Sequence, residues 1–273
     1  MKIPSLSFGS AEFQYDFTFP CEIHQCYPRA IPNPKNFRVL IHTAEPSPLK
    51  WATNEVRKYH GNFDLIITSD ENLKDLPNAE FMIFGDNWVT KKPNQKKFSV
   101  SYLHSVGIKA EWDGYKFRDQ IWSQRKSFST TAELNFWYSK RRPPAHSEIE
   151  ETDHPFPGET KDILYESMFS ICIENLKEKN YFTEKLIDPL STATIPIYFG
   201  CSNIYDFFDM NGIICVNSFA ELFHAIKNLS PELYWEKWPA MNQNMELSKK
   251  YHSGILRVKE LIESKFQFKA QCS

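Results

Sequence analysis

The segment 169–200 gathers side chains that suit an anionic ligand. An apolar run that predicts a strand stops at a carboxylate and an amide, and a short polar loop then leads to a predicted helix start. Thr183 is placed to cap that helix, whereas Lys185 in the first turn opposes the helix dipole, so a bound anion would resolve the conflict. The polar side chains gathered here are Glu174, Asn175, Tyr181, Thr183, Glu184 and Lys185.

These residues and their spacing resemble the α1,3/1,4-fucosyltransferases of glycosyltransferase family 10. The family motif is a strand that ends in Glu-Asn, a helix start of the form Tyr-x-Thr-Glu-Lys, and a later strand with a proline and a closing glycine. One departure is Pro189, which replaces the usual alanine after Asp188. The matching residues are Phe169, Cys172, Glu174, Asn175, Tyr181, Thr183, Glu184, Lys185, Leu186, Asp188, Thr194, Ile195, Pro196, Ile197 and Gly200.

The resemblance implies a role for each polar residue of the motif. Tyr181 would stack near guanine, Glu184 would hold the ribose hydroxyls, and Lys185 would meet the diphosphate. Asn175 would shape the nucleotide pocket, and Glu174 would bind substrate only if it turns toward sugar hydroxyls, because a carboxylate beside a diphosphate repels it. The structural alternatives are a half-buried core tyrosine and a glutamate that merely begins a helix.

A second cation is expected at Arg118, on the predicted helix 114–128. Family members carry an arginine there that faces the diphosphate, which makes Arg118 part of the expected catalytic set. A rival basic cluster at Lys140, Arg141 and Arg142 is interpreted as a solvated turn before Pro143.

The general base is expected in the amino-terminal part of the chain. The family places a catalytic glutamate just after a strand, and here Glu45 follows the predicted strand 37–43. A turn acid before a proline is the structural alternative for Glu45. His42 ranks second as a base on chemical grounds alone.

The function that the resemblance implies is inverting transfer of L-fucose from GDP-fucose to a hydroxyl of a glycan acceptor, α1,3-linked to GlcNAc or Glc. Two alternatives stay open. One is a transferase that uses another GDP-sugar on the same scaffold. The other is a catalytically silent protein that binds a carbohydrate or a nucleotide.

The elements that must position these residues alternate between strands and helices, which predicts parallel sheets. The fold class expected is α/β of the GT-B type, with two Rossmann-like domains and an interdomain cleft. The polar stretch 90–97 suggests the boundary. The predicted domains are 1–92 on the acceptor side, 93–245 for the nucleotide sugar, and a carboxyl-terminal helix in 246–273 that packs across both.

Composition narrows the partners and cofactors. The formal net charge of −2 gives no footprint for nucleic acid. No Asp-x-Asp motif and no zinc-type cysteine spacing occur, so no cofactor and no metal are expected. The first twenty residues lack a signal-peptide core and no transmembrane run is present, which predicts a cytoplasmic chain, with a trimmed membrane anchor as the alternative.

Overall fold

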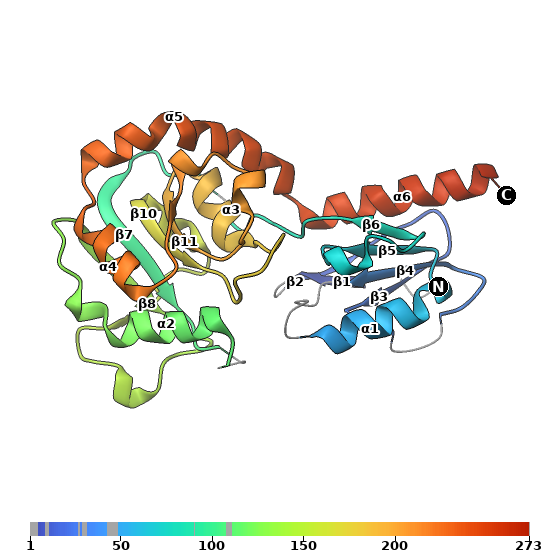
Figure 1. The fold of residues 1–273 in the computed structure, drawn as a ribbon, viewed down its shortest axis with the longest axis horizontal. Helices are drawn as coiled ribbons and strands as arrows, with labels where there is room; N and C mark the ends of the chain where they lie inside the picture. Colours follow the sequence, from blue (N-terminus) through green and yellow to red (C-terminus); the bar gives the residue numbers. More distant parts are fainter. Residues whose placement is uncertain are drawn as a thin grey trace. The chain divides into compact units, whose positions relative to one another are not determined.

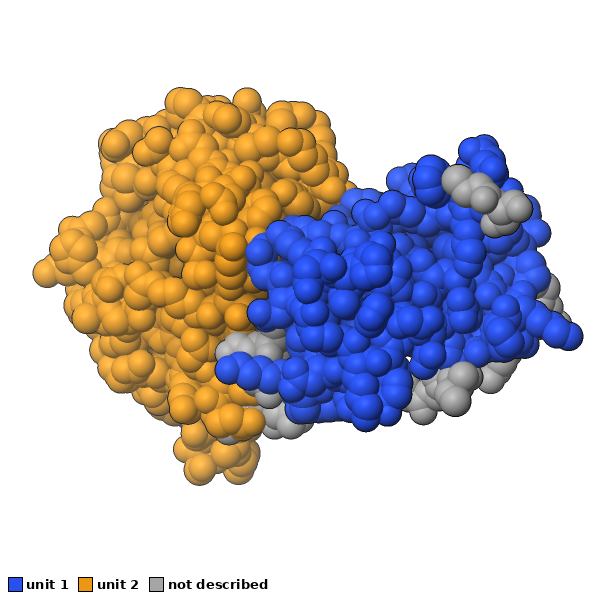
Figure 2. Space-filling view, turned by 45° about the vertical axis from the view of Figure 1, so that its right-hand side comes forward, with its two compact units in different colours: residues 1–84, 253–273 blue, residues 85–252 orange. Residues whose placement is uncertain are grey.

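The computed structural model describes residues 5–8, 11–26, 28, 32–42, 49–89, 91–107 and 111–272, with side chains for those of them from 15 to 271. The chain folds into two compact units, which Figure 2 colours separately. Unit 1 comprises Met1–Phe84 and Ser253–Ser273, and unit 2 comprises Gly85–His252.

Unit 1 is built on a parallel sheet of four strands in the order β3-β4-β5-β6 (Figure 1). The central strands carry apolar residues on both faces because helices cover both faces. Val39 and Ile41 pack with Val258 and Ile262 of the carboxyl-terminal helix, whereas Leu40 packs in the core that contains Val56 of α1. The elements are β1 (Ser5–Phe8), β2 (Ala11–Gln14), β3 (Cys21–Gln25), β4 (Phe37–His42), α1 (Lys50–Tyr59), β5 (Leu65–Thr68), β6 (Ala79–Phe81) and α6 (Gly254–Cys272).

Unit 2 contains a six-stranded sheet in the order β12-β11-β10-β7-β8-β9, in which every neighbouring pair is parallel. The chain proceeds outward from β7 in one direction and from β10 in the other. The carboxyl ends of β7 and β10 therefore form a topological switch point, where ligands of such sheets bind. The elements are β7 (Lys97–His104), α2 (Asp113–Ser123), β8 (Glu133–Tyr138), β9 (His154–Pro155), β10 (Ser167–Ile173), α3 (Glu184–Ser191), β11 (Ile195–Phe199), β12 (Ile214–Cys215), α4 (Phe219–Lys227) and α5 (Pro231–Ser248).

Helices α3 and α5 pack against each other, as Figure 1 shows. The Tyr234 hydroxyl on α5 donates a hydrogen bond to the Ala193 carbonyl at 2.9 Å, just after α3, and its ring contacts Phe169 on β10. These contacts hold α3 beside β10, so that the loop after β10 leads directly to the amino terminus of α3.

The unit boundary differs from the sequence expectation. It lies between Phe84 and Gly85 instead of after residue 92. The physical reason is that the following segment is tied to α3. Asn87 donates to the Ser191 hydroxyl at 2.9 Å, and the Trp88 N–H donates to the Asp188 carboxylate at 2.7 Å.

The carboxyl-terminal region also departs from the expectation of one helix that packs across both domains. Helix α5 ends at Ser248 in unit 2, and α6 begins at Gly254 in unit 1. Between them Ser253 adopts a φ of 52°, which is incompatible with a continuous right-handed helix. Helix α6 packs on the sheet of unit 1 through Val258 and Ile262.

Candidate functional site

Strand β10 ends in a buried carboxylate that braces the start of α3. Glu174 is completely buried, and its two oxygens accept hydrogen bonds from the N–H and the hydroxyl of Thr183 at 2.7 and 2.8 Å. Burial raises the pKa of Glu174. Glu174 is therefore engaged with the helix start, and in this structure it faces Thr183.

Thr183 is the amino-terminal cap of α3, as the sequence predicts. Its hydroxyl accepts a hydrogen bond from the Lys185 N–H at 3.3 Å, which satisfies one of the exposed donors of the first turn. The cap also positions the side chains that follow. The Lys185 ammonium lies 3.2 Å from the Thr183 hydroxyl, 3.4 Å from Glu184 Oε1 and 3.8 Å from Glu174 Oε2.

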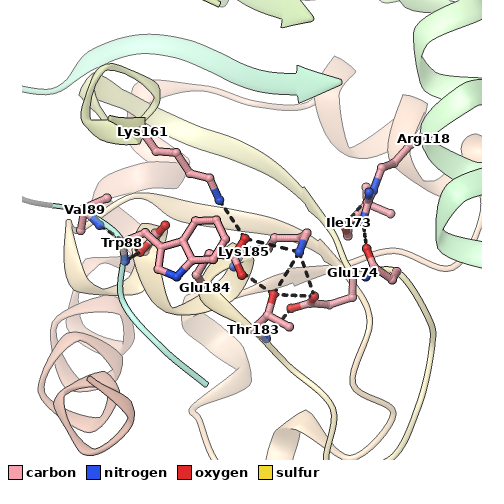
Figure 3. A network of polar contacts seen from close by, with 11 residues as sticks. Trp88, Val89, Arg118, Lys161, Ile173, Glu174, Thr183, Glu184 and Lys185 are labelled. Carbon is pink, nitrogen blue, oxygen red and sulfur yellow. Dashed lines mark hydrogen bonds and ion pairs between the residues drawn. The ribbon is translucent and has the colours of Figure 1, made fainter. Parts of the chain in front are cut away.

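The carboxylate of Glu184 sits between two lysines (Figure 3). Lys161 Nζ lies 2.8 Å from Glu184 Oε1, and the Lys185 ammonium approaches the same oxygen. Burial alone would raise the pKa of Glu184, but the two ammonium groups outweigh it and hold that pKa well below its usual range. Glu184 is thus a fixed anion that can accept hydrogen bonds from ligand hydroxyls.

Arg118 and Asn175 come together beside the end of β10. The guanidinium of Arg118 donates to the Ile173 carbonyl from Nε at 3.1 Å and from Nη2 at 2.8 Å, and Nη2 also donates to Asn175 Oδ1 at 2.7 Å. The side chain also stacks on the Tyr115 ring, 4.8 Å from its centroid. Arg118 is buried and organises the loop after β10, and its expected contact with a diphosphate stays a prediction.

Tyr181 packs on a small apolar cluster formed by Trp112, Tyr115 and Leu176. The ring of Tyr181 is half-buried, so that part of it stays accessible for stacking. The residue before it, Asn180, has a φ of 59° and exchanges hydrogen bonds with Asn203 at 2.8 and 2.9 Å. This asparagine pair fixes the turn that presents Tyr181.

Of the two residues expected as the general base, the structure describes only His42. Glu45 lies outside the described residues. His42 is 1% exposed, with Nδ1 2.5 Å from the Cys26 carbonyl and Nε2 3.8 Å from Asp70 Oδ2. This histidine is enclosed by unit 1, which does not favour a role as base. The rival cations Lys140 and Arg141 are exposed, as expected of a solvated turn.

Trp88, Lys161 and Asp188 were not among the site residues expected from the sequence, although all three contact the segment around Glu184 or one another. The Lys161 ammonium lies 4.3 Å from the centroid of the Trp88 ring, and Asp188 Oδ1 accepts from the N–H groups of Trp88 and Val89 at 2.7 and 3.3 Å. The sequence shows Lys161 ahead of β10 and Asp188 in the family motif. It does not show that both contact Trp88, which lies at the start of unit 2.

A family model supports the sequence resemblance. Residues 146–251, which include Lys161, Glu174, Thr183, Glu184, Lys185 and Asp188, match the model described as Glycosyltransferase family 10 (fucosyltransferase) C-term. The carboxyl-terminal part of this chain is therefore similar to glycosyltransferase family 10. The match covers β10, α3 and β11, and therefore the residues that surround Lys185.

Two curated relatives of this chain are fucosyltransferases by name. Alpha-(1,3)-fucosyltransferase B of Drosophila melanogaster is 25% identical over 219 residues, 78% of this chain and 47% of the relative, so the chain spans about half of that protein. Alpha-(1,3)-fucosyltransferase FucT of Helicobacter pylori is 34% identical over 65 residues, 24% of this chain and 14% of the relative.

Two solved structures share the fold at low sequence identity. The crystal structure of an α1,3-fucosyltransferase with GDP has a TM-score of 0.51 and 16% identity, with 84% of this chain and 77% of that chain covered. TarM has a TM-score of 0.55 and 10% identity, with 85% and 51% covered. The predicted GT-B fold class is confirmed by these likenesses and by the parallel sheet in each unit. Within the described part of the chain, none of the helices combines the length and apolar character needed to span a membrane.

Proposed function

We propose that this protein is an inverting fucosyltransferase that moves L-fucose from GDP-fucose to a hydroxyl of a glycan acceptor. The observation that carries the proposal is the cluster at the amino terminus of α3, where a capped helix start holds Lys185 beside Glu184 within the family-matched segment. Such a helix start attracts anions. The related α1,3-fucosyltransferase that shares the fold was solved with GDP.

The residues of the cluster suit the parts of a nucleoside diphosphate sugar. Lys185, whose side chain is 26% exposed, can turn to the diphosphate at the positive end of the α3 helix dipole. Glu184 accepts hydrogen bonds from the ribose hydroxyls, and the accessible part of the Tyr181 ring stacks near guanine. Arg118 and Asn175 shape the loop that lines the nucleotide.

The transfer step that we propose needs one base and one anion clamp. The acceptor hydroxyl attacks the anomeric carbon of the donor while GDP leaves from the opposite face, and Glu45 takes the hydroxyl proton. Lys185 at the amino terminus of α3 stabilises the charge that grows on the diphosphate, without a metal ion. A GlcNAc or Glc residue that receives an α1,3-linked fucose is the acceptor we expect, in keeping with the α1,3 names of several relatives.

A donor screen tests this proposal. Purified protein is mixed with GDP-fucose, GDP-mannose or GDP-rhamnose, each with a panel of GlcNAc- and Glc-terminated acceptors, and GDP release is measured. The proposal expects release to be fastest with GDP-fucose and to depend on the acceptor. Faster release from another GDP-sugar would change the donor but keep the scaffold. GDP binding without release from any donor would favour a silent binding protein.

A further inference from the structure

Lys161 is a cation of unit 2 that the proposed reaction does not yet use. It begins the short helical turn Lys161–Glu166 that leads into β10. Its Nζ lies 2.8 Å from Glu184 Oε1, and the two side chains are 21% and 9% exposed. An ion pair this well shielded holds its geometry, unlike the weak pairs of an open surface.

The same oxygen of Glu184 also faces Lys185, but that contact is looser. The Lys185 ammonium stands 3.4 Å away, is 26% exposed, and has the Thr183 hydroxyl and Glu174 as further neighbours. Lys161 is therefore the tighter partner of the carboxylate, and Lys185 is the more accessible of the two cations.

Trp88 holds Lys161 from its other side. The ammonium lies 4.3 Å from the centroid of the indole ring, within the range of a cation–π contact (Figure 3). The backbone of Trp88 is itself fixed, since its N–H donates to the buried Asp188 carboxylate at 2.7 Å. The indole, the ammonium and the Glu184 carboxylate thus form a chain of contacts that runs toward the start of α3.

We propose that Lys161 is a positioning residue, which holds the Glu184 carboxylate toward a pair of ligand hydroxyls and leaves Lys185 free to bind the anionic part of the ligand. The inference rests on the proposed function, because it takes the ligand to be a ribonucleoside diphosphate. When Lys185 turns to the diphosphate, Glu184 would otherwise become an unpaired buried anion, which is costly. With Lys161 in place, the carboxylate keeps a counter-charge through the whole binding event.

The test compares two nucleotides that differ only in the ribose hydroxyls. Affinities of GDP and 2′,3′-dideoxy-GDP are measured by calorimetry for the wild type, Lys161→Met and Lys161→Arg. The wild type is expected to favour GDP by about tenfold, the value of one well-placed hydrogen-bonding pair. Lys161→Met should bind GDP about tenfold more weakly and lose the preference, whereas Lys161→Arg, which keeps the charge, should retain the preference.

The pH dependence of GDP binding is a second measurement, and a lysine with a purely structural role would leave it unchanged. Without Lys161, burial dominates and the pKa of Glu184 rises, so GDP binding by Lys161→Met should weaken from about pH 7 to about pH 5 more than binding by Lys161→Arg does. Comparison of the two variants cancels the titration of GDP itself.

Three results would overturn the inference. The first is a Lys161→Met protein that still prefers GDP over the dideoxy nucleotide by the wild-type factor. The second is a pH profile that is the same for Lys161→Met and Lys161→Arg. The third is a wild type that binds neither nucleotide. This result differs from the other two because it would overturn the proposed function as well.

If Lys161→Met does not fold, Lys161→Gln, which keeps a donor but no charge, replaces it in both assays.

Discussion

The guanidinium of Arg118 donates to Asn175 Oδ1 at 2.7 Å and to the Ile173 carbonyl through two of its N–H groups. Arg118 on α2 therefore fixes the last residue of β10 and the loop that follows it. We therefore expect Arg118 to contribute both to stability and to ligand binding, because the same contacts shape the loop beside Glu174.

Replacement of Arg118 separates this role from a direct diphosphate contact. Arg118→Met leaves the Ile173 carbonyl without its guanidinium partner, and we expect the free energy of unfolding to fall by about 1–3 kcal/mol. Urea denaturation measures it, with the exposed Arg141→Met as the matched control, which should change little. Unchanged stability with a large loss of turnover would instead support a direct contact with the diphosphate.

Gly114 permits the close approach of α2 to the site loop. A Cβ atom at this position would lie 1.9 Å from the Glu174 carbonyl oxygen and 2.6 Å from the Asn175 carbonyl oxygen, both of them backbone atoms. Gly114→Ala should therefore destabilise unit 2 by about 1–3 kcal/mol and weaken GDP binding. Gly61→Ala is the control, since nothing lies within 4 Å of its Cβ. Equal unfolding midpoints for the two variants would refute the packing argument.

The buried carboxyl group of Asp188 should make the free energy of unfolding depend on pH. Its Oδ1 accepts from Trp88, its Oδ2 has no hydrogen-bond partner among the described residues, and burial raises its pKa to about 7. An unfolded aspartate ionises near pH ~4, so between about pH 4 and pH 7 the folded state holds an extra proton and its stability falls as the pH rises.

Asp188→Asn removes this titration, so the variant should gain stability relative to the wild type as the pH rises from about 5 to about 8, by at most ~1.4 kcal/mol per pH unit. Urea unfolding of both proteins at each pH measures the difference. A stability difference that stays constant with pH would show that Asp188 does not titrate in this range.

Metal independence follows from the way the diphosphate is expected to be neutralised. The sequence has no Asp-x-Asp motif, and in our proposal Lys185 balances the negative charge of the diphosphate. GDP release should therefore persist in excess EDTA at the untreated rate. A loss of activity that added Mg²⁺ or Mn²⁺ restores would contradict this prediction.

The local parts of the site were predictable from the sequence. The start of α3 follows from Thr183 as a cap, and the end of β10 follows from the abrupt change from apolar residues to Glu174. Helix α5 was missed, although Ser230 as its cap and Pro231 in its first turn are ordinary start signals.

The contacts of Lys161 and Arg118 could not be predicted in the same way. The Trp88–Lys161–Glu184 chain joins three segments that are far apart in sequence, and only tertiary packing brings them together. For Arg118 the helix was predicted and the side-chain partners were not, because a buried guanidinium and one that faces a ligand have the same sequence signature. The role of Glu45 stays a prediction.

Acceptor-stimulated release of GDP from GDP-fucose is the measurement that tests the proposed function most directly. It compares the wild type with Glu45→Gln and Lys185→Ala. We expect release that requires an acceptor, a loss of about 10²- to 10⁴-fold for Glu45→Gln, and a loss of about 10²- to 10³-fold for Lys185→Ala. A wild-type protein that neither binds GDP-fucose nor releases GDP from it would contradict the proposed function.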